Sequence, residues 1–125
     1  MIAVVSPYFD YGSPGSQSSP TNVVSAGRGE FIYDNFVPHG YALAQVAVFA
    51  TEESTGCFDY RGDGEGLGIH MAVEWLGTQN WSNGHVAIYG KSYEGATAWE
   101  AAAQGSEYLK TIVPISGTTA LGPLL

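Results

Sequence analysis

The fold of this chain is decided by one stretch, which reads His85-Val86-Ala87-Ile88-Tyr89-Gly90-Lys91-Ser92-Tyr93-Glu94-Gly95. Its first half, 85–89, is mostly apolar and predicts a short strand, and the alanine-rich segment 93–104 predicts a helix. A sharp turn over 90–95 therefore joins a strand to a helix, with Ser92 near its centre. Glycines flank the serine because a turn of this kind leaves little room for side chains.

A serine at such a turn presents its hydroxyl at the carboxyl end of the sheet, above the start of the helix. The backbone N–H groups that follow Ser92, beginning with that of Tyr93, would point at the oxygen of a bound carbonyl and supply half of an oxyanion hole. The context thus predicts a nucleophile elbow. The alternative is a helix N-cap serine, which contributes about 1 kcal/mol to stability. An elbow serine can also cap its helix, so the two interpretations are compatible.

The rest of the chain repeats the alternation of strand and helix. Apolar runs predict buried strands at 2–9 and 41–50 and a further strand at 109–116, and helices are expected at 31–39 and 67–79, with loops at 12–29 and 51–66. This order argues for a mostly parallel sheet flanked by helices, the α/β class. We expect one domain over 1–125.

Composition narrows the function classes. The chain has 125 residues, 45% of them apolar, which is typical of a globular domain rather than a disordered one. Four basic residues against twelve acidic ones give a net charge of −8, which argues against nucleic acid and anionic membranes as partners.

We recognise neither a membrane-spanning run nor a signal peptide, which slightly favours the cytoplasm. A single cysteine, Cys57, excludes an internal disulfide and lacks the partners of a zinc site.

An acidic, glycine-rich stretch at 59–66 offers three carboxylates, those of Asp59, Asp63 and Glu65. A calcium loop is one interpretation, but the spacing does not match an EF-hand, and a solvated acidic loop is favoured. The glycines do not form a dinucleotide-binding pattern, so neither a cofactor nor a metal is expected. The tryptophans bracket the helices and are expected to serve packing; they are Trp75, Trp81 and Trp99.

Several motifs together carry a family resemblance. They are the turn at 90–95, the segments 74–76 and 79–84 before it, 101–102 and 109–114 after it, and Ser6-Pro7-Tyr8 upstream. In these motifs the chain resembles the α/β-hydrolases of the X-prolyl dipeptidyl-peptidase and cocaine-esterase group. The resemblance covers residues 2–119 except the loop at 12–29, and it is most specific from residue 70 onward.

The resemblance implies a partial α/β-hydrolase core and a serine hydrolase mechanism on esters or amides, including X-Pro peptides and amino-acid or aryl esters. It makes Ser92 the acylated nucleophile, with the Tyr93 backbone N–H and the Tyr8 phenol as oxyanion donors; a phenol donates more strongly as the oxyanion charge develops. One stretch departs from the pattern. Relatives carry Asp-x-Arg-Gly after the second strand, where this chain reads Ala47-Val48-Phe49-Ala50, and the resemblance resumes at 54–60.

The two partners that activate a hydrolase serine do not follow it in this sequence. They normally come after the serine, first an acid and then a histidine, but no Asp and no His occurs after Ser92. The three histidines, which come earlier, are not expected to act as the base: His39, His70 and His85. We therefore expect a fragment of a longer hydrolase, whose exposed outer strands invite self-association. Two alternatives are a non-catalytic binding module on the same scaffold and one half of a two-chain enzyme.

Overall fold

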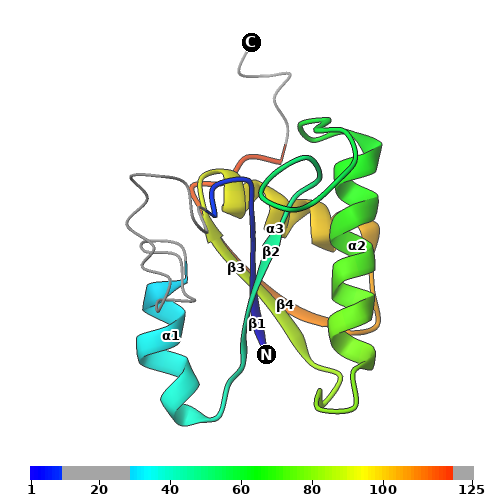
Figure 1. Ribbon diagram of the computed structural model, residues 1–125. Helices are drawn as coiled ribbons and strands as arrows, with labels where there is room; N and C mark the ends of the chain where they lie inside the picture. Colours follow the sequence, from blue (N-terminus) through cyan, green and yellow to red (C-terminus); the bar gives the residue numbers. More distant parts are fainter. Residues whose placement is uncertain (10–28, 120–125) are drawn as a thin grey trace.

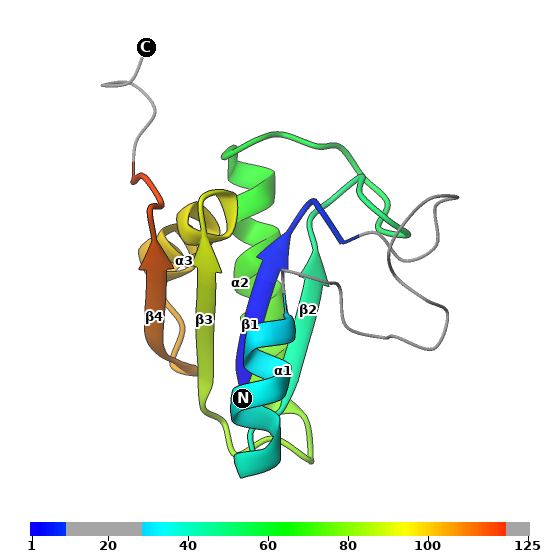
Figure 2. The ribbon, with the colours of Figure 1, turned by 90° about the vertical axis from the view of Figure 1, so that its left-hand side faces the viewer.

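A computed structural model of the protein describes residues 1–9 and 29–119. Four strands form one sheet in the order β2-β1-β3-β4, and every neighbouring pair is parallel (Figure 2). The strands are β1 (Ile2–Ser6), β2 (Leu43–Ala47), β3 (Val86–Lys91) and β4 (Leu109–Ile115). The helices are α1 (Glu30–Phe36), the 3₁₀ turn η1 (Val37–His39), α2 (Asp63–Thr78) and α3 (Tyr93–Gln104). The predicted α/β class with a parallel sheet is confirmed.

The helices cover the two faces of the sheet unequally. Helix α1 lies against one face, and α2 and α3 lie together against the other (Figure 1). The hydrophobic core fills the space between the sheet and the α2–α3 pair, where Val5 and Ile88 meet Ile69 and Val73. Because β1 lies inside the sheet, between β2 and β3, all five of its residues are buried. The turns that carry the candidate site follow these central strands at their carboxyl ends.

Most helices and strands are observed close to the positions that the sequence predicts. Helix α3 has the expected bounds, and helix α1 with η1 fills the expected 31–39 segment, which Gly40 ends at a φ of 87°. The segment at 41–50 was expected to be a buried strand, which is wrong in part. Strand β2 covers 43–47 and is half-buried, because it forms one edge of the described sheet. The expected loop at 12–29 lies outside the described residues except for Gly29.

Helix α2 begins at Asp63, four residues before the expected start at 67. Glycines at 62, 64 and 66 made this segment look like a loop. The Asp59 carboxylate stabilises the first turn instead, since it accepts hydrogen bonds of 2.9 Å from the backbone N–H groups of Gly64 and Glu65. The acidic stretch is therefore the start of a helix rather than a loop.

The expected packing role of the tryptophans is wrong for the described structure. The side chains of Trp75 and Trp81 are 59% and 58% exposed, and they contact each other edge to face with ring centroids 6.3 Å apart. Trp99 on α3 is also exposed.

Among the described residues, no helix combines the length and the apolar character that crossing a bilayer requires.

Candidate active site

Ser92 lies at the carboxyl end of β3, at the junction with α3, in a backbone conformation that serine seldom adopts. Its φ is 62° and its ψ is −115°, a combination that costs about 1–3 kcal/mol and persists only where the surroundings impose it. Ser92 occupies the N-cap position, but its side chain makes no capping hydrogen bond. The N-cap interpretation is therefore wrong for the hydroxyl, which stays exposed at the carboxyl edge of the sheet.

Close backbone approaches impose this turn. A Cβ on Gly90 would lie 2.2 Å from the Cβ of Glu94, and one on Gly95 would lie 2.9 Å from the carbonyl oxygen of Ile115. The Ser92 N–H donates a 2.8 Å hydrogen bond to the same Ile115 carbonyl. Both flanking glycines are thus required for space, as the sequence predicts, and β4 helps to hold the turn.

Tyr8 lies next to this turn because β1, which it follows, pairs with β3. The rings of Tyr8 and Tyr93 meet edge to face, with centroids 5.7 Å apart and planes at 76°, and the Tyr8 side chain is 52% exposed. The structure therefore brings together the three residues predicted for the site, which are Tyr8, Ser92 and Tyr93.

A buried hydrogen bond ties the end of β1 to the first turn of α3. The Ser6 hydroxyl donates to Glu94 Oε1 over 2.6 Å and accepts from the Tyr8 N–H over 3.1 Å. Both Ser6 and Glu94 are buried. Sequence reasoning missed them, because neither residue type at these positions signals a contact across 88 residues of chain.

The histidines lie elsewhere. His39 and His85 line a hollow at the amino edge of the sheet, together with Met1, on the side opposite Ser92. His70 is half-buried within α2. A second hollow of about 320 Å³ borders Ser92 itself, on the α1 face, where Phe31 stacks on Tyr89 with centroids 5.9 Å apart.

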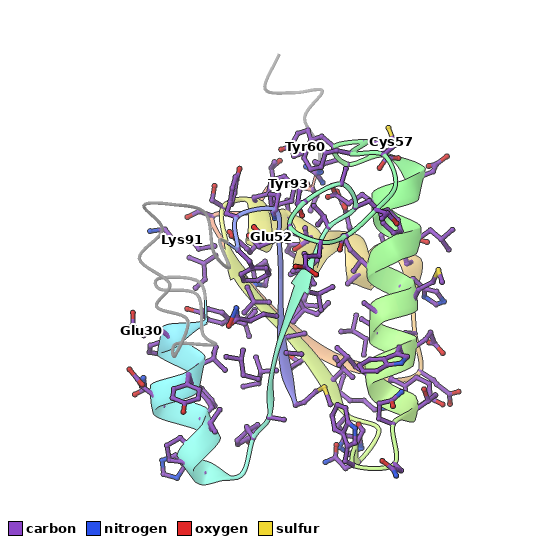
Figure 3. All side chains as sticks on the ribbon, in the orientation of Figure 1. Glu30, Glu52, Cys57, Tyr60, Lys91 and Tyr93 are labelled. Atoms are coloured by element: carbon purple, nitrogen blue, oxygen red, sulfur yellow. The ribbon has the colours of Figure 1, made fainter. Side chains whose placement is uncertain are left out.

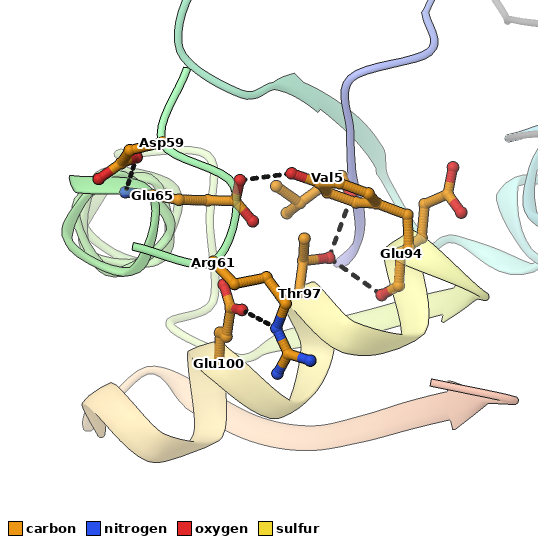
Figure 4. Close-up of polar contacts among 8 residues, drawn as sticks. Val5, Asp59, Arg61, Glu65, Glu94, Thr97 and Glu100 are labelled. Atoms are coloured by element: carbon orange, nitrogen blue, oxygen red, sulfur yellow. Dashed lines mark hydrogen bonds and ion pairs between the residues drawn. The ribbon is translucent and has the colours of Figure 1, made fainter. Parts of the chain in front are cut away.

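The expectation of a solvated acidic loop is wrong for Glu65. Its side chain is buried and accepts a hydrogen bond from the Tyr93 hydroxyl. Its backbone N–H donates to the Asp59 carboxylate (Figure 4). Burial raises the pKa of Glu65, and the Tyr93 hydrogen bond lowers it by less. Burial is the largest cause that raises the pKa of Tyr93, and the hydrogen bond to Glu65 is the second. One signal was available in the sequence, since Glu65, Ile69 and Val73 share a helical stripe.

Two other carboxylates of this region are engaged as well, whereas Asp63 is exposed. Asp59 stabilises the start of α2, and Glu100 of α3 forms a 2.7 Å ion pair with Arg61. Within residues 1–9 and 29–119, no group of three or more histidine, cysteine or acidic side chains could hold a metal ion. The calcium interpretation therefore has no support in the described structure.

Comparison with known proteins shows which family the chain belongs to. The model of the X-Pro dipeptidyl-peptidase (S15) family matches residues 1–122. The chain belongs to this family.

Relatives of this S15-family chain carry two kinds of name. A Streptomyces avermitilis protein, assigned provisionally by its name to the Xaa-Pro dipeptidyl-peptidases, is 35% identical over 93% of this chain and 20% of its own length. The cocaine esterase of a Rhodococcus species is 36% identical over 63% of this chain and 14% of its own length. The chain thus spans about a fifth or less of the curated relatives it matches.

The S15-family chain also shares its fold with solved structures. A CocE/NonD family hydrolase from Staphylococcus aureus superposes with a TM-score of 0.77 at 23% identity, over 96% of this chain and 22% of that one. An aminopeptidase from a marine sediment thaumarchaeon gives a TM-score of 0.70 at 20% identity, over 97% of this chain and 21% of that one. The described sheet and helices are part of an α/β-hydrolase core.

Proposed function

We propose that this chain carries the nucleophile of a serine hydrolase that cleaves esters or amides through an acyl-enzyme. The observation that carries the proposal is the backbone of Ser92, held at a φ of 62° between β3 and α3 with its hydroxyl exposed and not capping. A conformation of this cost is kept where function requires it. The names of the relatives, which include peptidases and an esterase, agree with acyl transfer to water.

In the proposed reaction, Ser92 Oγ attacks the carbonyl carbon of the substrate, and a general base takes the hydroxyl proton. The carbonyl oxygen becomes an oxyanion, which accepts hydrogen bonds from the Tyr93 N–H and the Tyr8 hydroxyl. The C–O or C–N bond then breaks, and the leaving group departs with the proton. Water next attacks the acyl-enzyme, the acid product leaves, and Ser92 regains its proton.

The base and its orienting acid are proposed to come from polypeptide beyond these residues. The sequence offers no His and no Asp after Ser92, and two of the three histidines lie at the opposite edge of the sheet. By analogy with the relatives, the proposed substrates are X-Pro peptides and amino-acid or aryl esters. The Tyr8 side chain, the proposed second oxyanion donor, is 52% exposed.

Labelling with a fluorophosphonate tests the proposal. The reagent is applied to the chain alone and to any longer polypeptide that carries it, and the modified peptide is identified by mass spectrometry. We expect the adduct on Ser92, its loss in Ser92→Ala, and its retention in Ser116→Ala, which removes the exposed serine that follows β4. Labelling only with a second chain would favour the two-chain enzyme. An adduct absent under all conditions, or on another serine, would reject the proposal.

A further inference from the structure

A buried side-chain network lies directly behind the residue that follows Ser92. Tyr93 is the first residue of α3, and its ring points back toward α2, where its hydroxyl donates to Glu65 Oε2. Tyr93 is 8% exposed and Glu65 is 3% exposed, so this hydrogen bond is shielded from water. A shielded hydrogen bond is stronger than an exposed one and costs more to leave unmade.

Aromatic rings surround Tyr93 on its other sides. Tyr60 and Phe58, from the segment that precedes α2, lie with ring centroids 5.2 Å and 6.5 Å from that of Tyr93, and Tyr8 closes a third side at 5.7 Å. Tyr60 and Tyr93 lie together at the carboxyl edge of the sheet (Figure 3). The Tyr93 side chain is therefore held by its ring and by its hydroxyl, and its backbone has little freedom to rotate.

We propose that Glu65 is a positioning residue for the nucleophile turn: through the Tyr93 hydroxyl it fixes the backbone N–H that follows Ser92. The hydrogen bond anchors the first residue of α3 to α2, and the Tyr93 N–H belongs to the same residue. An oxyanion donor displaced by a fraction of an ångström is a weaker donor, because stabilisation of the transition state depends on distance and angle. The inference rests on the proposed function for its catalytic consequence but not for its structural part.

The surroundings of Glu65 favour its protonated form, because burial raises the pKa of this carboxyl. The charged and titratable groups facing it are Tyr93 and Glu100 from α3, Arg61 from the preceding segment, and Tyr60 beside Tyr93. Glu65 Oε1 and Glu100 Oε2 are both buried without a partner among the described residues, and the nearby Glu100 carboxylate adds to the rise in the pKa of Glu65. Two carboxyl groups can form a hydrogen bond with each other only when one of them carries a proton. A proton on Glu65 would let it donate to Glu100, which already forms the 2.7 Å ion pair with Arg61.

Three variants and one control test the positioning role. Tyr93→Phe removes the donor and keeps the ring, and Glu65→Leu removes the acceptor at similar size. Glu65→Gln imitates the protonated acid, since its carbonyl accepts from Tyr93 and its amide donates to Glu100. Tyr33→Phe removes a hydroxyl from an exposed tyrosine on α1, on the other face of the sheet.

The first measurement is hydrogen exchange of the amides at 90–96, which requires no activity. We expect exchange about 10-fold faster in Tyr93→Phe and Glu65→Leu, and within about twofold of wild type in Glu65→Gln and Tyr33→Phe. Amides of β1 should keep their protection in all four, which separates local loosening from global destabilisation. If Glu65→Leu does not fold, the contrast between Tyr93→Phe and Glu65→Gln decides. Unchanged exchange in Tyr93→Phe would overturn the proposal.

The second measurement is ester hydrolysis by the protein that labels at Ser92. We expect kcat to fall about 10-fold in Tyr93→Phe, with KM within about twofold of the wild-type value. Glu65→Gln should keep the wild-type kcat. Equal kcat in wild type and Tyr93→Phe would overturn the positioning role. A wild-type protein that neither labels nor hydrolyses would reject the proposed function alone, because the exchange result still decides the positioning role.

Discussion

The Ser6 hydroxyl donates a 2.6 Å hydrogen bond to Glu94, which joins the end of β1 to the first turn of α3 across 88 residues of chain. Thr97 reinforces this junction, since its hydroxyl donates to the carbonyl oxygen of Val5 over 3.0 Å. The turn that holds Ser92 and the strand end that leads to Tyr8 are therefore parts of one buried polar unit. Five predictions test this arrangement and its surroundings.

Ser6→Ala should destabilise the chain by about 1–3 kcal/mol, because it removes a buried hydrogen bond to a carboxyl group and the acceptor of the Tyr8 N–H. Urea unfolding measures the change. A midpoint equal to that of wild type would show that the Ser6–Glu94 contact contributes nothing to stability.

Ser92→Gly should be more stable than Ser92→Ala by about 1–2 kcal/mol. Glycine adopts a φ of 62° without strain, whereas alanine keeps the Cβ that makes this conformation costly. Neither variant can form the proposed fluorophosphonate adduct at this position, so stability and reactivity should separate. Equal unfolding midpoints for the two variants would mean that the turn stores no strain at Ser92.

Gly95→Ala should cost several kcal/mol, whereas Gly66→Ala should be neutral or slightly stabilising, although both positions are helical. A Cβ at Gly95 would meet the backbone of Ile115 and Gly117 at 2.9–3.0 Å, and neither can move aside. At Gly66 the nearest atom is the end of the flexible Gln104 side chain, and alanine favours helix over glycine by about 0.5–1 kcal/mol. Thermal unfolding of the pair checks this, and similar costs at both positions would contradict it.

Glu65→Gln should change how stability depends on pH. Because the pKa of Glu65 is raised by burial above the unfolded value of 4.5, the folded chain binds the proton more tightly than the unfolded chain. The wild type should therefore lose stability as the pH rises from about 4.5 through the raised pKa, and glutamine, which has no proton to lose, should not show this part of the loss. Urea midpoints at several pH values should favour Glu65→Gln increasingly as the pH rises. A difference that stays constant with pH would contradict a raised pKa of Glu65 in the folded chain.

The chain expressed alone should self-associate through its edge strands. Strands β2 and β4 are the edges of the described sheet, and Val113 and Ile115 on β4 are 44% and 37% exposed. Sedimentation over a range of concentrations should show larger species. Val113→Lys should reduce them, and Leu67→Lys, on the exposed face of α2, should not. A monomer at all concentrations would contradict the prediction.

Local sequence patterns were sufficient for much of the fold. Apolar runs and an alanine-rich segment locate the strands and α3, because burial and helix propensity act over short windows. The start of α2 is not predicted, because it depends on a contact rather than on local composition. Its glycines oppose a helix, and the Asp59 carboxylate that stabilises its first turn acts through geometry that composition does not reveal.

The candidate site also combines features that the sequence predicts with contacts that only the tertiary structure shows. The sequence by itself determined that Ser92 lies at a strand-to-helix turn, since the flanking glycines, the strand and the helix are neighbours in the chain. Only the tertiary structure decided which distant residues support that turn: Ser6 beneath Glu94, the aromatic rings around Tyr93, and Glu65 behind it. These contacts arise when parallel strands align their carboxyl ends and α2 packs beside α3. A buried carboxyl group and a solvated one have the same letter in the sequence, and only the packing around Glu65 distinguishes them.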